Sequence, residues 1–200
     1  MVRVLVVEDQ ALVRGAIAAL LNLAEDVEVV GEAENGQVAL TMLKKIDVDL
    51  VLSDIEMPEM TGIELAEQLR TAAPKTKVVI MTTFSRAGYV RRALDAGVQG
   101  FILKEAPSED LIAAIVKVMA GQKIIDPELA IRALESQDPL TDKERKALRL
   151  AGMGMKTSEI AERLCLSEGT VRNYLSEAIA KLNAGNRIDA YRIAHQMGWL

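Results

Sequence analysis

The chain has 200 residues, half of them hydrophobic, and a formal net charge of −5, and a length of this order suits one or two packed domains. Its apolar runs stay below the roughly 18 residues of a membrane-spanning helix, and the acidic pair Glu8-Asp9 comes too early for a signal peptide. The single cysteine and single histidine exclude an internal disulfide and a zinc site built on thiolate or several imidazole ligands. We therefore expect a cytoplasmic protein without membrane insertion, in which Cys165 is a buried core residue.

Short apolar runs alternate with helical patterns through the first 121 residues. Strands are predicted at residues 2–7, 27–30, 50–54, 78–81 and 101–103. Apolar residues at helical spacing follow each run, within residues 11–21, 35–43, 62–69, 89–94 and 108–119. Five such βα units predict an α/β fold with a parallel sheet that helices cover on both faces.

Polar residues stand where these strands end. Glu8 and Asp9 follow the first strand, Asp54 ends the third, Thr82 follows the fourth and Lys104 the fifth. Parallel strands place these ends along one edge of the sheet, where open α/β sheets carry their sites. Each residue alone is explained as a solvated strand end. Together, three carboxylates require a cation such as Mg²⁺, and the lysine and hydroxyl complete the groups that an acyl-phosphate site needs.

The alternation of strands and helices stops at Gly121, and residues 122–139 are predicted to be a linker. The part of this linker between Pro127 and Pro139 is predicted to be partly helical. Residues 140–200 carry a net charge of +3, against −8 for residues 1–139. This asymmetry suggests two domains with different tasks, one of them involving nucleic acid. Thr141 and Glu144 form a capping box that opens the second domain, which we expect to be all-helical.

A short helix, a tight turn after Leu166 and a longer helix from Ser167 predict a helix-turn-helix. The longer helix places polar side chains opposite its apolar stripe, and such side chains bind base edges and phosphates. The alternative from spacing alone is a small helical bundle for protein contact. The polar face consists of Thr170, Arg172, Asn173, Ser176 and Lys181.

The strand-end residues, with Met57-Pro58 after Asp54, resemble the receiver domain of bacterial two-component response regulators over residues 2–121. The resemblance implies a flavodoxin-like (βα)5 fold, Asp54 as phosphoacceptor, and Mg²⁺ held by Glu8, Asp9, Asp54 and the backbone carbonyl of Glu56. Thr82 and Lys104 would bind the phosphoryl group. Phe101 matches an aromatic switch position, although a plain core aromatic explains it as well. Three residues differ from those usual in receiver domains, namely Thr83, Glu56 and Glu105. These differences leave open how long the phosphoryl group would last on Asp54.

The second half resembles the LuxR-type DNA-binding domain, and the whole chain resembles the NarL/FixJ response regulators. The motifs that carry this are Leu140-Thr-x-x-Glu144, Glu159-Ile-Ala161, Leu166-Ser-x-x-Thr-Val-Arg172, Lys181-Leu182 and Asn186-Arg187. The family implies base contacts by Arg172, Asn173 and Ser176. It implies backbone contacts by Lys156, Thr157, Thr170, Tyr174 and Lys181. The runs 54–58, 82–84 and 171–174 and the ending Gly198-Trp199 look most like DesR-type regulators, whose role is control of membrane-lipid desaturation.

The resemblance implies a transcription factor rather than an enzyme. A sensor histidine kinase would phosphorylate Asp54, the protein would form a homodimer, and the dimer would bind double-stranded promoter DNA. One alternative is a phosphorylation-independent transcription factor with a structural receiver, which the intact carboxylates and lysine disfavour. Another is a Mg²⁺-dependent phosphatase, which the glutamate at position 56, in place of a second catalytic aspartate, disfavours.

Overall fold

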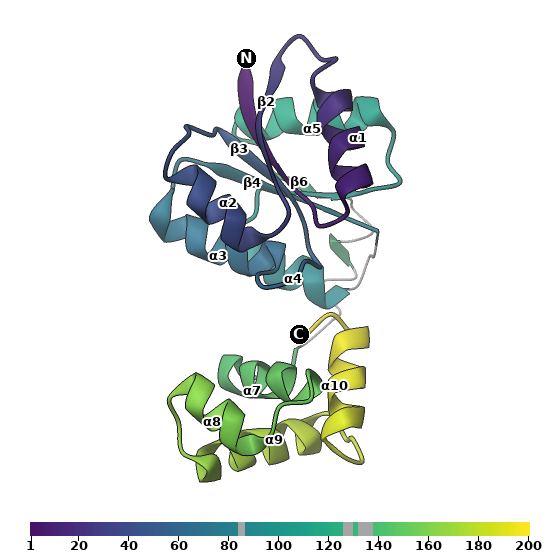
Figure 1. Cartoon of the computed structure of the whole chain (residues 1–200). Helices are drawn as coiled ribbons and strands as arrows, with labels where there is room; N and C mark the ends of the chain where they lie inside the picture. The colour runs from purple at the N-terminus through teal and green to yellow at the C-terminus, as the bar shows by residue number, and fades with distance from the viewer. Residues whose placement is uncertain (84–86, 126–129, 132–137) are drawn as a thin grey trace. The chain divides into compact units, whose positions relative to one another are not determined.

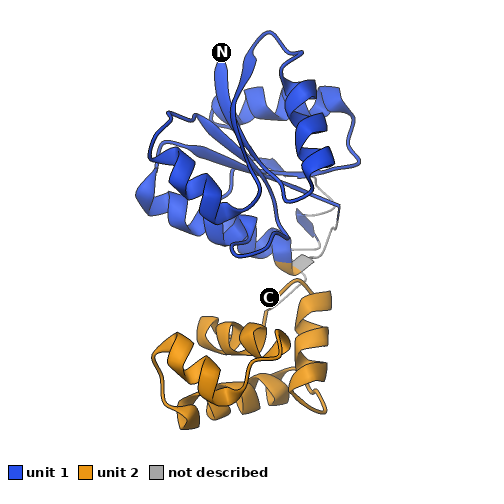
Figure 2. Ribbon diagram, viewed as in Figure 1, with its two compact units in different colours: residues 1–85, 89–133 blue, residues 86–88, 134–200 orange. Residues whose placement is uncertain are grey.

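The computed structural model describes residues 1–83, 87–125, 130–131 and 138–200 (Figure 1). The chain forms two compact units, which Figure 2 colours separately. The first contains residues 1–85 and 89–133, and the second contains residues 86–88 and 134–200.

The first unit is built on one parallel sheet, whose strand order within the described residues is β2-β1-β3-β4-β5-β6. The strands are β1 (Val2–Val7), β2 (Val27–Ala33), β3 (Leu50–Asp54), β4 (Lys77–Thr82), β5 (Gly100–Leu103) and β6 (Ile124–Ile125). Helices lie on both faces of the sheet (Figure 1). They are α1 (Ala11–Leu21), α2 (Gly36–Leu43), α3 (Gly62–Ala72), α4 (Ala87–Asp95) and α5 (Ser108–Met119). The predicted doubly covered α/β fold is confirmed.

The central strands are apolar throughout because both of their faces are buried. On β1, Leu5 and Val7 belong to the core that includes residues of α3 and α4, whereas Val4 and Val6 belong to the core shared with α5. All four side chains are at most 1% exposed. A near-continuous hydrophobic run is thus the sequence signature of a strand between two helical layers.

The register of the sheet brings the polar strand ends together. Strands β1, β3, β4 and β5 are consecutive neighbours, and all of them run parallel. Asp54 pairs with Met81, which precedes Thr82, and Thr82 pairs with Leu103, which precedes Lys104. The predicted polar residues therefore lie at the carboxyl edge of four adjacent strands.

The sixth strand was not predicted. Its two residues, Ile124 and Ile125, pair with Gly100 and Phe101 of β5. They fall inside the segment 122–139 that the sequence assigns to a linker. A two-residue run carries too little periodicity to indicate a strand. Most of the segment between Pro127 and Pro139, where the sequence predicts a partly helical linker, lies outside the described residues.

The second unit contains α7 (Asp142–Gly152), α8 (Thr157–Leu164), α9 (Glu168–Lys181) and α10 (Arg187–Gln196). The predicted capping box is present, because the backbone N–H of Glu144 donates to Thr141 Oγ1 and that of Thr141 donates to Glu144 Oε2. Buried residues from all four helices share one core. Across the described residues, no helix combines the length and apolar character that a membrane span requires.

The expectation that Cys165 is buried was wrong. It follows α8 as its C-terminal cap in the left-handed conformation, with φ of 55°, and its side chain is exposed. Its two leucine neighbours suggested a core position, but a left-handed residue at a helix end turns the chain away from the helix axis. The preceding α8 and the following α9 then form the predicted helix-turn-helix.

Candidate functional site

Three carboxylates meet at the carboxyl edge of the sheet. Ligand oxygens of Glu8, Asp9 and Asp54 lie within 4.8 Å of one another. Glu8 and Asp54 are 1% and 8% exposed, whereas Asp9 faces solvent. Carboxylates this close repel one another unless a cation neutralises them. An oxygen donor set that is open to water on one side fits Mg²⁺, which keeps several of its waters when bound.

Lys104 already supplies part of the balancing charge. Its Nζ donates a hydrogen bond to Glu8 Oε2 at 2.6 Å and lies 3.0 Å from Asp54 Oδ2. Burial raises the pKa of Asp54, and the Lys104 ammonium opposes but does not cancel that effect. Burial alone would lower the pKa of Lys104, but its bonds to Glu8 and Asp54 raise it. The site therefore holds a fixed cation beside a carboxylate whose ionised form is poorly stabilised.

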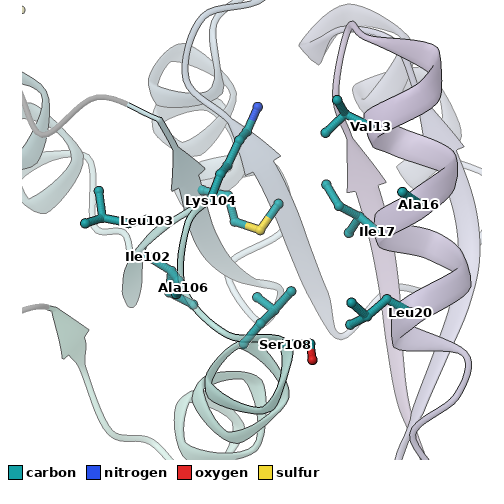
Figure 3. Close-up of a pocket in the computed structure, with 11 residues that line it drawn as sticks. Val13, Ala16, Ile17, Leu20, Ile102, Leu103, Lys104, Ala106 and Ser108 are labelled. Carbon is teal, nitrogen blue, oxygen red and sulfur yellow. The ribbon is translucent and has the colours of Figure 1, made fainter.

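The stem of Lys104 lies beside an apolar pocket of about 180 Å³ between α1 and the start of α5. Figure 3 shows Val13, Ile17 and Leu20 of α1 facing the segment that carries Lys104. A long cationic side chain commonly buries its stem and presents its head to a polar neighbour. The apolar wall thus helps direct the ammonium toward the acidic cluster.

Thr82 and Phe101 flank the cluster on β4 and β5. Both are 2% exposed, and Phe101 belongs to the core that includes α3 and α4. The backbone N–H of Lys104 donates to the carbonyl of Thr82 at 2.8 Å. Phe101 therefore faces inward here, an orientation compatible with both a switch residue and a plain core aromatic.

The loop after Asp54 is shaped by contacts that sequence reasoning missed. The backbone N–H of Ile55 donates to Asp54 Oδ1 at 2.7 Å. A Cβ on Gly62 would lie 2.0 Å from the carbonyl oxygen of Asp54, so only glycine allows α3 to begin there. The Tyr89 hydroxyl donates to Glu56 Oε1 at 2.6 Å. The Thr61-x-x-Glu64 capping box could have marked the start of α3, whereas nothing in the local sequence indicates the Glu56–Tyr89 pair.

In the second unit, α9 carries a polar face opposite its buried stripe of Val171, Leu175 and Ala178. Arg172, Asn173 and Ser176 are exposed. The hydroxyl of Ser167 caps α9 by accepting from the backbone N–H of Thr170 at 3.1 Å. An exposed face of arginine, asparagine and serine on the second helix of a helix-turn-helix suits contacts with base edges.

The family is shown by comparison with known proteins. A family model described as the response regulator receiver domain matches residues 4–116. A second, described as bacterial regulatory proteins of the luxR family, matches residues 138–194. The chain belongs to the response regulators with a LuxR-type helix-turn-helix. It is a DNA-binding response regulator of a two-component system, and its family is one of transcription factors rather than enzymes.

Relatives align with this response regulator along its whole length. The transcriptional regulatory protein YvfU of Bacillus subtilis is 44% identical over 200 residues, covering 100% of both chains. DesR of the same organism is 45% identical over 199 residues, covering 100% of this chain and 99% of its own. RcsB from Salmonella enterica serovar Typhimurium, solved on the rprA promoter with the phosphomimetic BeF3⁻, is 26% identical. It covers 96% of this chain and 97% of its own with a TM-score of 0.73.

The remaining residues predicted to contact DNA have different surroundings. Lys156 is exposed at the start of α8, and Thr157, Thr170 and Tyr174 are half-buried. Lys181 places its Nζ 2.8 Å from both carboxylate oxygens of Glu144, which is 1% exposed. The sequence indicated Glu144 only as a capping residue, so its second role, as the ion-pair partner of Lys181 on α9, was missed.

Proposed function

We propose that this response regulator is switched by phosphorylation of Asp54, which a sensor histidine kinase supplies. The observation that carries the proposal is the Lys104 ammonium 3.0 Å from Asp54 Oδ2, within the cluster of three carboxylates. An Asp54 oxygen attacks phosphorus, the bond from phosphorus to the kinase histidine breaks, and an acyl phosphate forms. Glu8, Asp9, Asp54 and the Glu56 carbonyl would hold Mg²⁺, which would neutralise charge on the phosphoryl oxygens.

The chain's own residues then respond to the new charge. Lys104 exchanges its contact with the Asp54 carboxylate for a phosphoryl oxygen, and the Thr82 hydroxyl donates to another. Because β4 and β5 are neighbours, movement of Thr82 changes the packing beside the inward-facing Phe101, which biases a two-state surface near α4 and α5. Two receivers then associate and pair their DNA-binding domains on promoter half-sites about one helical turn apart. Relevant to this, one RcsB structure is described as two RcsB dimers bound to two parallel DNAs.

On DNA, we propose that Arg172, Asn173 and Ser176 read base edges and that Lys156, Thr157, Thr170, Tyr174 and Lys181 contact the backbone. The exposed polar face of α9 supports the first group. We also propose that the protein acts in the cytoplasm, where its kinase partner and promoter are accessible. Control of membrane-lipid desaturation genes rests on the resemblance to DesR-type regulators, and binding to promoters of such genes tests it.

The test is intact mass after incubation with acetyl phosphate and Mg²⁺, for wild type and Asp54→Asn, with size-exclusion chromatography and DNA binding on the same samples. We expect a phosphoryl adduct and a shift to dimer in wild type only. An adduct without dimerisation would contradict the dimer step. If neither acetyl phosphate nor the partner kinase yields an adduct while DNA binding persists, the protein is a phosphorylation-independent transcription factor.

A further inference from the structure

Glu56 and Tyr89 join the phosphoacceptor loop to α4. Glu56 stands two residues after Asp54 and is half-buried, while Tyr89 is 3% exposed in the first turn of α4. The 2.6 Å separation between Tyr89 Oη and Glu56 Oε1 is that of a charge-assisted O–H···O⁻ bond. Such a bond is stronger in a buried setting than in water.

The Tyr89 ring is packed into the receiver core. Tyr89, Val90 and Ala93 are at most 3% exposed and belong to the same hydrophobic core. The phenol is thus held by packing, and the Glu56 carboxylate is directed to it. The two oxygens of Asp54 are engaged elsewhere, Oδ1 by the Ile55 N–H and Oδ2 by Lys104. Two carboxylates that are close in sequence are therefore held by different partners.

A carboxylate near an acyl phosphate affects its hydrolysis. In that step a water oxygen attacks phosphorus, the bond from phosphorus to the Asp54 oxygen breaks, and the Asp54 carboxylate and dihydrogen phosphate leave, with both water protons on the phosphate. A carboxylate that accepts a hydrogen bond from the attacking water orients it and accelerates the step. Glu56 lies on the loop that adjoins Asp54, so its orientation matters for this step.

We propose that Tyr89 is a positioning residue that holds the Glu56 carboxylate on α4, away from the hydrolytic water, and so lengthens the life of phosphorylated Asp54. This inference rests on the proposed function, because it requires an acyl phosphate at Asp54. Tyr89 and Glu56 together would set how long the phosphorylated state lasts.

The central variant is Tyr89→Phe, which removes one oxygen and keeps the ring in the core. The full chain is phosphorylated with acetyl phosphate and Mg²⁺, the phosphodonor is removed, and the adduct is followed by intact mass. We expect the half-life of the adduct to fall by about threefold or more, well within what a positioned proton acceptor contributes. A half-life equal to that of wild type would overturn the proposal.

A double-mutant cycle separates this role from a structural one. In Glu56→Ala there is no carboxylate to hold, so Glu56→Ala and Tyr89→Phe/Glu56→Ala should decay at rates within about twofold of each other. Equal acceleration by Tyr89→Phe in both backgrounds would contradict the proposal. Leu94→Ala is the matched control, because it removes packing at the C-terminal end of α4 and leaves Tyr89, Val90 and Ala93 unchanged. Its decay should stay near that of wild type, and decay as fast as Tyr89→Phe would assign the effect to helix packing.

The adduct of wild type and its half-life in Tyr89→Phe distinguish failure of the proposed function from failure of the Tyr89 role. If wild type forms no adduct with acetyl phosphate or with the kinase, both the proposed function and this inference are overturned. If wild type forms the adduct and the Tyr89→Phe half-life is unchanged, only the positioning role of Tyr89 is overturned.

Discussion

Each unit of the molecule contains a lysine bonded to a buried glutamate, and the two pairs differ in their charge balance. Lys104 faces Glu8 and Asp54 within a cluster of three carboxylates. Lys181 faces Glu144, which also accepts from the Thr141 backbone. Burial raises the pKa of Asp54 in spite of Lys104, whereas Lys181 and Thr141 outweigh the burial of Glu144 and lower its pKa.

A functional site and a structural ion pair differ in how well their buried charges are balanced. A satisfied buried carboxylate holds elements together, here α7 and α9, because its charge is matched by a cation and by backbone hydrogen bonds. A cluster with surplus negative charge is poorly satisfied on its own, and a buried carboxylate with a raised pKa, such as Asp54, is typical of functional sites. The surplus at Glu8, Asp9 and Asp54 is what a divalent cation would complete.

The largest expected effect tests that surplus directly. Mg²⁺ should stabilise the wild-type receiver by about 2.7 kcal/mol when its concentration is a hundredfold above the dissociation constant. Asp54→Asn should lower the affinity and reduce the stabilisation at equal Mg²⁺. Thermal unfolding followed by circular dichroism, with Ca²⁺ and EDTA as controls, measures this. Equal Mg²⁺ stabilisation of both proteins would place the ion elsewhere.

Breaking the Lys181–Glu144 ion pair should have the next largest effect on stability. Lys181→Met leaves Glu144 buried without its cation, and we expect a loss of about 2 kcal/mol, below the range for fully buried pairs because Lys181 is partly exposed. The single tryptophan, Trp199, packs against the core of the second unit, so its fluorescence in urea measures the change. Lys156→Met is the matched control, because Lys156 is exposed, and it should stay within about 0.5 kcal/mol. Similar losses of stability in both variants would contradict a structural role for the Lys181–Glu144 ion pair.

The two carboxylates should respond to pH with opposite signs. Glu144 has a lowered pKa, so its contribution to stability is present above the ordinary value of 4.5 and is lost as the pH falls through its folded value. Asp54 has a raised pKa, so the folded state is favoured below the ordinary value of 3.8 and loses that advantage as the pH rises through the folded value. In metal-free buffer at neutral pH, Asp54→Asn should therefore stabilise the receiver by about 1 kcal/mol. Denaturant titrations across the pH range, in which Asp54→Asn lost stability at neutral pH, would contradict this.

The smallest expected effect concerns the backbone of both units. Glu59 after β3 and Cys165 after α8 adopt φ of 63° and 55°, which costs an L-residue more than it costs glycine. Glu59→Gly and Cys165→Gly should each stabilise the protein by about 0.5 kcal/mol, because the relief of strain exceeds the added entropy of the unfolded chain. Gly15→Ala inside α1 makes the opposite change, from glycine to alanine, at a position where a Cβ meets no atom within 4 Å. It should also stabilise the protein, because alanine favours the helical conformation over glycine. Destabilisation by both glycine variants would mean that these side chains contribute more than their backbones cost.

Local sequence was sufficient for much of the fold and for the members of the phosphoacceptor site. The five longer strands and the helices that follow them were visible because burial on two faces produces apolar runs and burial on one face produces helical periodicity. Glu8, Asp9, Asp54, Thr82 and Lys104 could be grouped because parallel strands end at a common edge. The capping residue Thr141 and the polar face of α9 likewise follow from short-range rules.

Contacts between residues far apart in the chain were decided by the tertiary structure alone. Glu56 meets Tyr89 across 33 residues and Glu144 meets Lys181 across 37, and no local pattern encodes which buried carboxylate faces which partner. Strand β6 exists because β5 offers it an edge, and the exposure of Cys165 depends on how α8 ends. Composition and periodicity determine which residues are buried and which element they form, whereas partners, and with them pKa values, depend on how those elements pack.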